Sequence, residues 1–255
     1  MARGNREPLP RATQVSKKMS WLLRHGAEEE GLQFLDGGFL NVADVISNRK
    51  FKSMKITFAE MKEVVASDEK QRYTMMPKPD ADAASDKPSD FLIRVNQGHS
   101  VKMESEGLLT PVTKENVPVT AVHGTTHAAW GLIVSSGGLK AMGRNHVHFA
   151  SGLPAGFTSI VEHDEATQTA APVISGMRKT STILVFLDVA RAMDAGLNFG
   201  LSDNGVLLTE GDKNGLVPLE LFQRVEDRTG LGLLVQDGKI VKEAPASWAK
   251  GKGKA

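Results

Sequence analysis

A change of hydrophobic pattern near residue 97 constrains the fold of this 255-residue chain more than any other feature. Before that point, apolar residues recur at helical spacing. After it, they form short β-branched runs separated by glycines, such as Ile183–Asp188 and Val206–Thr209, and such runs are typical of strands. The chain is therefore expected to be an α+β protein with two lobes, the second of them rich in strands.

The first lobe, residues 13–96, begins with an expected helix of about 13 residues that ends at Gly26. Its apolar stripe consists of Val15, Met19, Leu22 and Leu23. The elements expected after it are a hairpin at 32–40, a short helix at 42–46, a helix from the capping box Thr57–Glu60, and strands at 72–76 and 91–95. That order is typical of a winged helix.

Three segments are expected to lie outside the packed cores. Residues 77–90, between the two strands of the first lobe, hold three prolines and four aspartates, which favours a mobile acidic insertion in the wing. Residues 1–12 are polar and contain proline, and residues 241–255 end in a basic tail of low complexity. Both ends are expected to be disordered, so the second lobe is placed at 97–240.

The composition excludes several classes of protein. The chain has no cysteine, which rules out disulfide scaffolds and thiolate zinc sites and favours a cytoplasmic or nuclear location. No apolar run reaches the roughly 18 residues of a membrane span, so no membrane partner is expected. A net charge of +1 and 5% aromatic residues disfavour nucleic-acid binding over the whole surface and leave local phosphate contacts as the expected mode.

Known catalytic motifs are also missing from the sequence. It contains no Gly-x-Gly-x-x-Gly, no Walker loop, no His-Glu-x-x-His and no Gly-x-Ser-x-Gly. His146 and His148 alternate along an expected strand, so they face opposite sides and cannot share a metal ion. We therefore predict no metal site.

Polar clusters interrupt the apolar segments at 22–26, 70–73, 97–100, 122–125 and 142–149. Taken singly, each has a structural explanation. Arg24 and His25 could complement a helix dipole, Arg72 could be a surface charge, His123 a hydrogen-bonded core histidine and Arg144 a turn residue. Composition and spacing alone do not decide between these roles and catalytic ones.

In this order, however, the clusters resemble the family of NAD-dependent RNA 2′-phosphotransferases, which remove the 2′-phosphate left at a tRNA splice junction. The resemblance extends from about Val15 to Gly211. It is carried by the segments Ser16–Ala27, Asp68–Tyr73, Arg94–Ser100, Val122–Thr125, Arg144–His148, Val173–Arg178 and Asn204–Gly211. It does not cover residues 77–90, residues 154–171 or the C-terminal 40 residues.

The resemblance implies a winged-helix lobe for RNA, an ADP-ribosyltransferase-like lobe for NAD, and specific roles for individual residues. The implied catalytic residues are Arg24, His25, Arg72 and Arg144. The implied NAD-binding residues are His123, Gly124, Thr125 and His148. RNA phosphates are assigned to Lys17, Lys18, Gln97, His99 and Ser100. Val206 stands where many protein-modifying relatives have a catalytic glutamate. The expected partners are NAD as co-substrate and a tRNA with an internal 2′-phosphate. The protein is expected to be a monomer and to need no metal.

The chemistry implied by the resemblance has two steps. The RNA 2′-phosphate first displaces nicotinamide from NAD, which needs charge and positioning but no general base. The ribose O2″ of the 2′-phospho-ADP-ribosylated RNA then attacks the phosphorus and releases ADP-ribose 1″,2″-cyclic phosphate. His25 is the candidate for proton transfer or for orienting O2″, because an imidazole titrates near neutral pH.

Two alternatives remain open from the sequence. The chain could be an ADP-ribosyltransferase that modifies terminal phosphates of RNA or DNA, for which Arg24, His25 and Arg72 would not be needed. It could also be a non-catalytic RNA-binding module that binds NAD without turnover. Formation of ADP-ribose cyclic phosphate would distinguish the phosphotransferase from both.

Overall fold

The computed structural model describes residues 8–82, 84–101, 107–161 and 176–248. The chain divides into two compact units, Met1–Leu108 and Leu109–Ala255. Both contain helices and strands, in agreement with the α+β expectation. The division comes after Leu108 and not at residue 96, because residues 97–100 hydrogen-bond to Arg24 and His25 of the first unit.

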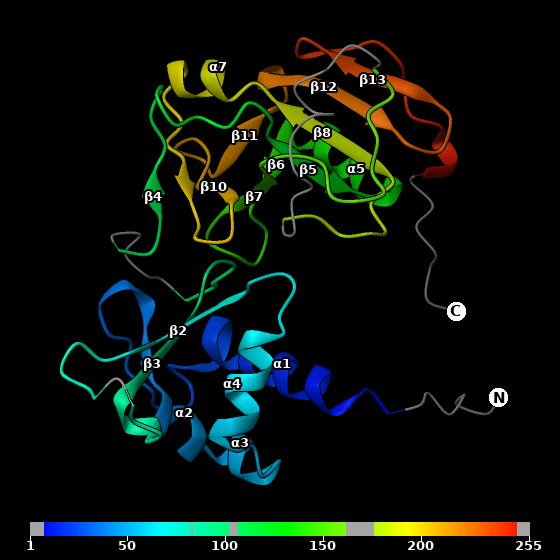
Figure 1. Ribbon diagram of the computed structural model, residues 1–255. Coiled ribbons are helices and arrows are strands. Elements are labelled where there is room, and N and C mark those ends of the chain that lie inside the picture. The colour runs from blue at the N-terminus through cyan, green and yellow to red at the C-terminus, as the bar shows by residue number, and fades with distance from the viewer. Residues whose placement is uncertain (1–7, 83, 102–106, 162–175, 249–255) are drawn as a thin grey trace. The chain divides into compact units, whose positions relative to one another are not determined.

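The first unit combines helices with a three-stranded antiparallel sheet of order β1-β3-β2 (Figure 1). Its helices are α1 (Arg11–Trp21), the π-helical η1 (Leu22–Gly26), α2 (Val42–Ser47), α3 (Arg49–Ser53) and α4 (Phe58–Ala66), with 3₁₀ turns η2 (Asp36–Gly38) and η3 (Pro88–Asp90). Its strands are β1 (Leu40–Asn41), β2 (Tyr73–Pro77) and β3 (Phe91–Val95). The two expected strands are present as β2 and β3. The capping box is confirmed as well, since Glu60 N–H donates to Thr57 Oγ1 at 3.2 Å. The expected hairpin at 32–40 is reduced to a Leu35–Phe39 bridge, because β1 pairs with β3.

One apolar core holds this unit together. The buried face of α1 packs with α2, α4 and the sheet. The buried residues of this core include Met19, Phe51, Met61 and Ile93. The phenol of Tyr73 reaches back to α1, where its oxygen lies 2.6 Å from Ser20 Oγ and donates to Ser16 O at 2.7 Å. The first helix is therefore tied to β2 by both packing and hydrogen bonds.

Two expectations about disorder are corrected in part. The chain is already helical at Arg11, because the guanidinium of Arg11 binds the Glu60 carboxylate of α4 with Nε at 2.6 Å and Nη2 at 3.0 Å. At the other end, the ring of Trp248 stacks on His127 with centroids 3.9 Å apart, so residues 241–248 pack against the second unit. Residues 1–7 and 249–255 lie outside the described residues.

The acidic insertion at 77–90 contacts the rest of its unit. Asn41 Nδ2 donates to Ser89 O at 3.0 Å, and Asp86 pairs with Lys62 of α4 at 2.8 Å. Within the insertion, Lys78 N–H donates to Asp90 O at 2.8 Å. Its position between β2 and β3 is as expected, and its mobility remains a prediction.

Among the described residues, the second unit contains a nine-stranded antiparallel sheet of order β14-β13-β12-β8-β5-β7-β10-β9-β4 and a separate pair β11-β6 (Figure 1). The strands are β4 (Thr110–Pro111), β5 (Val122–Thr125), β6 (Gly138–Lys140), β7 (Val147–Ala150), β8 (Ile183–Leu187), β9 (Gly200–Leu201), β10 (Val206–Thr209), β11 (Leu216–Pro218), β12 (Phe222–Asp227), β13 (Gly232–Gln236) and β14 (Lys239–Ile240). The helices are α5 (His127–Ser135) and α7 (Val189–Asp194), with 3₁₀ turns η4 (Leu219–Leu221) and η5 (Ala246–Trp248).

Both faces of this sheet are covered, as β8 shows. Ile183, Val185 and Leu187 belong to the main core, whereas Leu184 and Phe186 belong to a smaller core on the opposite face. Successive side chains of a strand alternate between faces, so a strand that is apolar throughout must be buried on both. In the part of the chain that the structure describes, no helix has the length and hydropathy needed to cross a membrane.

Candidate functional site

The first candidate cluster lies where α1 ends. The helix continues from Trp21 into one π-helical turn, Leu22–Gly26, and single π turns are often found at functional sites. Leu22 and Leu23 are buried against the core, whereas Arg24 is half-buried and His25 is exposed. The turn therefore holds two polar side chains on the outer side of a rigid element.

The segment Asn96–Ser100 binds this turn. Arg24 Nε donates to Gln97 O at 3.0 Å, Ser100 N–H donates to Arg24 O at 3.1 Å, and Ser100 Oγ lies 2.8 Å from His25 Nδ1. Gly98 between them has a φ of +89°, and a Cβ there would lie 3.3 Å from Arg24 Nε. A glycine is therefore needed at 98 both for the backbone conformation and for the approach of Arg24.

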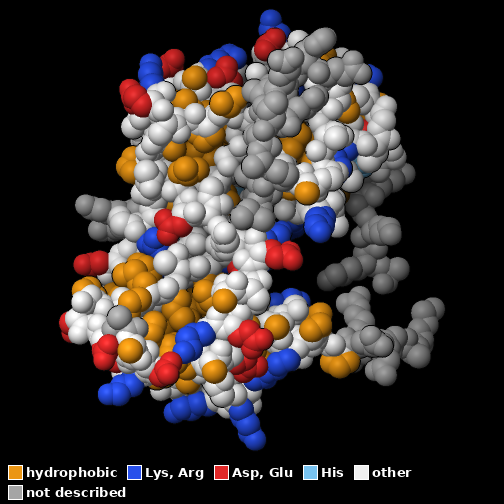
Figure 2. Space-filling view, in the orientation of Figure 1, with side chains coloured by type: hydrophobic (Ala, Val, Ile, Leu, Met, Phe, Trp, Pro, Cys, Tyr) orange, Lys and Arg blue, Asp and Glu red, His pale blue; other side chains and the backbone are white. Residues whose placement is uncertain are grey.

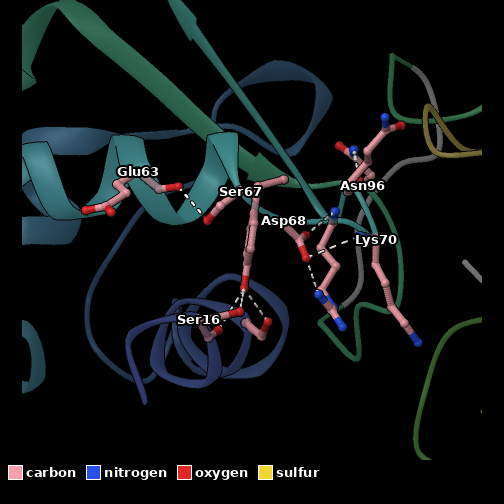
Figure 3. Close-up of polar contacts among 10 residues, drawn as sticks. Ser16, Glu63, Ser67, Asp68, Lys70 and Asn96 are labelled. Atoms are coloured by element: carbon pink, nitrogen blue, oxygen red, sulfur yellow. Dashed lines mark hydrogen bonds and ion pairs between the residues drawn. The ribbon is translucent and has the colours of Figure 1, made fainter. Parts of the chain in front are cut away.

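The same segment also binds Arg72. Asn96 N–H donates to Arg72 O at 2.7 Å, and Asn96 Nδ2 donates to Gln71 O at 2.9 Å. Figure 3 shows this region, with Asn96 and Lys70 near Asp68, whose carboxylate pairs with the Arg72 guanidinium. Three of the four residues predicted to be catalytic are thus linked through one short segment of the first unit.

The residues assigned to RNA phosphates lie in two places. Gln97 and His99 are buried and Ser100 is exposed, all in the segment just described, and Gln97 Oε1 has no hydrogen-bond partner among the described residues. Lys17 and Lys18 lie on α1. On the face drawn in Figure 2, basic side chains of the first unit alternate with acidic ones, so no broad basic surface is visible there.

The second candidate cluster lies in the sheet of the second unit, on β5 and β7. His123 Nδ1 lies 2.8 Å from the backbone oxygen of His148. Because a carbonyl oxygen only accepts, Nδ1 of His123 carries the proton and Nε2 is left as an acceptor. Burial lowers the pKa of His123, with a smaller contribution from the charge of Arg178, so its ring is neutral at neutral pH.

His148 is the more deeply buried of the two histidines. Its residue exposure is 8%, and Nε2 has no hydrogen-bond partner among the described residues. Burial, followed by the charge of Arg144, lowers the pKa of His148 to about 3. A buried ring nitrogen without a partner costs free energy unless a ligand or water satisfies it.

Arg144 and Arg178 add positive charge beside these histidines. Both residues have exposed atoms, but the guanidinium of Arg144 is partly buried. This partial burial, followed by the charge of Arg178, lowers the pKa of Arg144. Arg178 acts electrostatically on both Arg144 and His123. Arg178 receives no role from the sequence alone. Its position at the end of the segment Val173–Arg178, which carries part of the resemblance, is the one sequence feature that could have indicated a functional residue.

Gly124 and Thr125 make internal contacts. A Cβ on Gly124 would lie 2.2 Å from Met177 Cγ, so only glycine lets Met177 pack against β5. Thr125 is buried, and its backbone oxygen accepts from Thr182 N–H at 2.9 Å. Both residues therefore position β5 and His123. Val206 is fully buried opposite Ala150, so no carboxylate stands there.

The candidate catalytic residues belong to both units, Arg24, His25 and Arg72 to the first and Arg144 to the second. Within residues 8–82, 84–101, 107–161 and 176–248, no group of three or more histidine, aspartate or glutamate side chains could hold a metal ion. The residues predicted to be catalytic carry guanidinium and imidazole groups, which suit the binding of phosphate.

Guanidinium and imidazole groups are typical of proteins that bind phosphate, and comparison with known proteins gives the family of this chain. Residues 10–211 match the model of the RNA 2′-phosphotransferase, Tpt1 / KptA family. The chain belongs to this family, which confirms both the resemblance of the motifs and the expectation of a transferase.

Similar proteins come from eukaryotes and bacteria. The tRNA 2′-phosphotransferase 1 of Danio rerio is 36% identical over 226 residues, 88% of this chain and 89% of the relative. The tRNA 2′-phosphotransferase of Saccharomyces cerevisiae is 30% identical over 219 residues, 84% of each chain. A probable RNA 2′-phosphotransferase of Rhizobium leguminosarum is 32% identical over 198 residues, 78% of this chain and 89% of the relative.

Proposed function

We propose that this chain transfers the 2′-phosphate of a spliced tRNA to NAD, and that Arg24, His25, Arg72 and Arg144 are its catalytic residues. One observation carries the proposal: the segment Asn96–Ser100 hydrogen-bonds to both the Arg24–His25 turn and the backbone of Arg72. Residues far apart in sequence are thereby fixed to one support. Guanidinium groups keep their charge at any physiological pH and bind phosphate through paired N–H donors.

In the first step, an oxygen of the RNA 2′-phosphate forms a bond to C1″ of the nicotinamide ribose, and the bond from C1″ to nicotinamide breaks. Nicotinamide leaves as a neutral molecule, so no proton has to move. Arg24, Arg72 and Arg144 bind the phosphate oxygens and orient one of them for attack. Positioning and charge are enough for this step, which agrees with a valine, Val206, in place of a carboxylate.

In the second step, O2″ of the same ribose bonds to phosphorus and the RNA 2′-oxygen leaves. O2″ loses a proton and the RNA 2′-oxygen gains one. His25 is suited to this exchange because its ring is exposed and Ser100 Oγ, 2.8 Å from Nδ1, fixes the orientation of the ring. The products are RNA with a 2′-hydroxyl and ADP-ribose 1″,2″-cyclic phosphate.

The neutral histidines of the second unit fit the sugar of NAD, which is a substrate of this reaction. His123 Nε2 can accept a hydrogen bond from a ribose hydroxyl, and the buried Nε2 of His148 needs a partner that a ligand would supply. Arg144 and Arg178 would offset the negative charge of the phosphates of NAD.

The finer structural and cellular expectations belong to the same proposal. The first unit would be a winged-helix lobe that binds RNA, and the second an ADP-ribosyltransferase-like lobe that binds NAD. Further contacts to RNA phosphates would come from Lys17, Lys18, Gln97, His99 and Ser100. A chain without cysteine suits a reducing compartment, so the enzyme would act in the cytoplasm or nucleus. A monomeric state is a separate part of the proposal.

Product analysis tests the proposal. The protein is incubated with NAD and an oligonucleotide that carries one internal 2′-phosphate, and both products are identified by mass. We expect dephosphorylated RNA and ADP-ribose 1″,2″-cyclic phosphate in equal amounts. Stable ADP-ribosylated RNA without the cyclic phosphate would favour the terminal-phosphate ADP-ribosyltransferase instead. Bound NAD without any product would favour the non-catalytic module.

A further inference from the structure

Asp68 makes an unusual pair of contacts with Arg72. Its side chain is only 7% exposed, and one carboxylate oxygen accepts from Arg72 Nη1 while the other accepts from the backbone N–H of Arg72 at 2.6 Å (Figure 3). The N–H of Lys70 lies 3.4 Å from the first oxygen. The carboxylate therefore has a fixed orientation, set by the backbone of the residue whose side chain it holds.

The local backbone keeps this carboxylate in place. Gln71 has a φ of +45° and its N–H donates to Asp68 O at 2.8 Å, so residues 68–71 form a closed turn. The left-handed backbone conformation of Gln71 costs free energy, which the surrounding hydrogen bonds must offset. This turn leads directly into β2, so the backbone that carries Asp68 is continuous with a strand of the sheet.

Other arginine–carboxylate pairs of the same unit have a different geometry. Arg11 binds Glu60 through Nε and Nη2, and Arg49 binds Glu30 through the same two nitrogens. Both pairs therefore occupy the Nε–Nη2 edge, which is one of the edges that phosphate binds bidentately. In Arg72, the pair with Asp68 uses Nη1, and among the described residues Nε and Nη2 have no hydrogen-bonding acceptor.

We propose that Asp68 is a positioning residue that holds Arg72 by Nη1 and thereby directs the open Nε–Nη2 edge of its guanidinium to the substrate phosphate. This inference rests on the proposed role of Arg72. A free arginine side chain would lose rotamer entropy on binding phosphate, whereas one already held by a buried carboxylate has lost it on folding. Asp68 therefore improves phosphate binding without touching the substrate.

A binding measurement without NAD tests this role separately from catalysis. The probes are two RNA oligonucleotides of one sequence, one with an internal 2′-phosphate and one with a 2′-hydroxyl, and the readout is the ratio of their dissociation constants. We expect Asp68→Asn to lower this phosphate preference about 10-fold, as coupling within an ion-pair network does. The matched control is Asp86→Asn, which breaks the exposed pair with Lys62 and should leave the preference unchanged.

A double-mutant cycle distinguishes positioning from a merely structural role. Arg72→Ala should lower the phosphate preference. The preference that remains should come from Arg24 and His25. If Asp68 acts through Arg72, Asp68→Asn should have no further effect in the Arg72→Ala background. An equal loss in both backgrounds, or no loss in either, would overturn the inference.

Two further results have defined meanings. If Asp68→Asn does not fold, Asp68→Glu, which keeps the charge but moves the carboxylate by one methylene, takes its place in the cycle. If neither variant folds, Asp68 is a folding determinant and the inference is wrong. A wild-type protein without phosphate preference, or one that Arg72→Ala does not change, would contradict the proposed function itself.

Discussion

The two polar clusters of this chain hold their ionisable groups in opposite ways. In the first unit, the guanidinium groups of Arg24 and Arg72 contact a backbone carbonyl and a carboxylate, and His25 is exposed. In the second, His123 and His148 lie in buried strands, where burial lowers their pKa values and keeps their rings neutral. The first arrangement suits a phosphate anion, and the second suits the neutral hydroxyls of a sugar.

This contrast assigns different tasks to histidines that look alike in the sequence. His25 has a ring accessible to water and a fixed Nδ1, as proton exchange with a substrate requires. His123 has a protonated Nδ1 committed to the backbone of His148 and can only accept at Nε2. Substitutions that affect one cluster at a time test this difference between the histidines.

The largest expected effect is that of His25→Ala. Loss of a group used in proton transfer costs about 10²- to 10⁴-fold in rate, and here the loss should fall on the second step. We therefore expect 2′-phospho-ADP-ribosylated RNA to accumulate on a denaturing gel, and Arg24→Ala should behave in the same way. The matched variant His123→Ala should instead raise the KM for NAD, with no visible intermediate. If neither His25→Ala nor His123→Ala gives an intermediate, His25 is a ligand of the ground-state phosphate.

Local features of the fold were predictable from the sequence, and distant pairings were not. The capping box at Thr57 depends on a hydrogen bond within four residues, so a short sequence pattern reveals it. The contacts of residues 97–100 with the first unit could not be predicted, because the bonds of Gln97 and Ser100 to the Arg24–His25 turn join residues more than 70 positions apart. The packing of Trp248 on His127 is non-local as well.

The candidate site shows the same division. Positions such as Arg24 and Arg144 could be named because they stand in recognisable segments of the sequence. The pattern could not show that Arg178 acts electrostatically on Arg144, nor that Asp68 uses Nη1 of Arg72 and leaves the other edge open. Both facts depend on side-chain geometry across a turn or a sheet, for which no residue spacing is characteristic.

The second prediction concerns the neutral ring of His148, which the pH dependence of the free energy of unfolding tests. Its pKa of about 3 in the folded protein is below the roughly 6.5 of an unfolded histidine. Below pH 6.5 the unfolded chain therefore binds a proton that the folded chain does not, and stability falls as the pH falls towards 3. Between pH 7 and pH 5 this group should cost about 2 kcal/mol of unfolding free energy. Urea unfolding of wild type and His148→Gln at both pH values measures the difference, and parallel pH dependence of the two would contradict it.

A smaller effect is expected for Arg178→Ala. Removing one exposed cation beside Arg144 and His123 should raise the KM for NAD about 10-fold, as loss of a hydrogen bond to a charged group does. The turnover number should change little, and Arg178→Lys should restore part of the affinity. A fall in kcat at unchanged KM would instead place Arg178 on the transferred phosphate, and the two clusters would then be less distinct than proposed.

The smallest expected effect is that of removing divalent metal. In the proposed reaction, the arginine set balances the charge of the transferred phosphate, and nicotinamide leaves without help from a Lewis acid. Activity should therefore be the same in EDTA as in magnesium, within the error of the assay, when NAD and the 2′-phosphorylated oligonucleotide are saturating. The His25→Ala variant, assayed in parallel, checks that a fall in the second step would be detected. Activity that EDTA abolishes and magnesium restores would mean that a metal carries part of the charge now assigned to Arg24 and Arg72, and the contrast between a cationic and a neutral cluster would have to be redrawn around that ion.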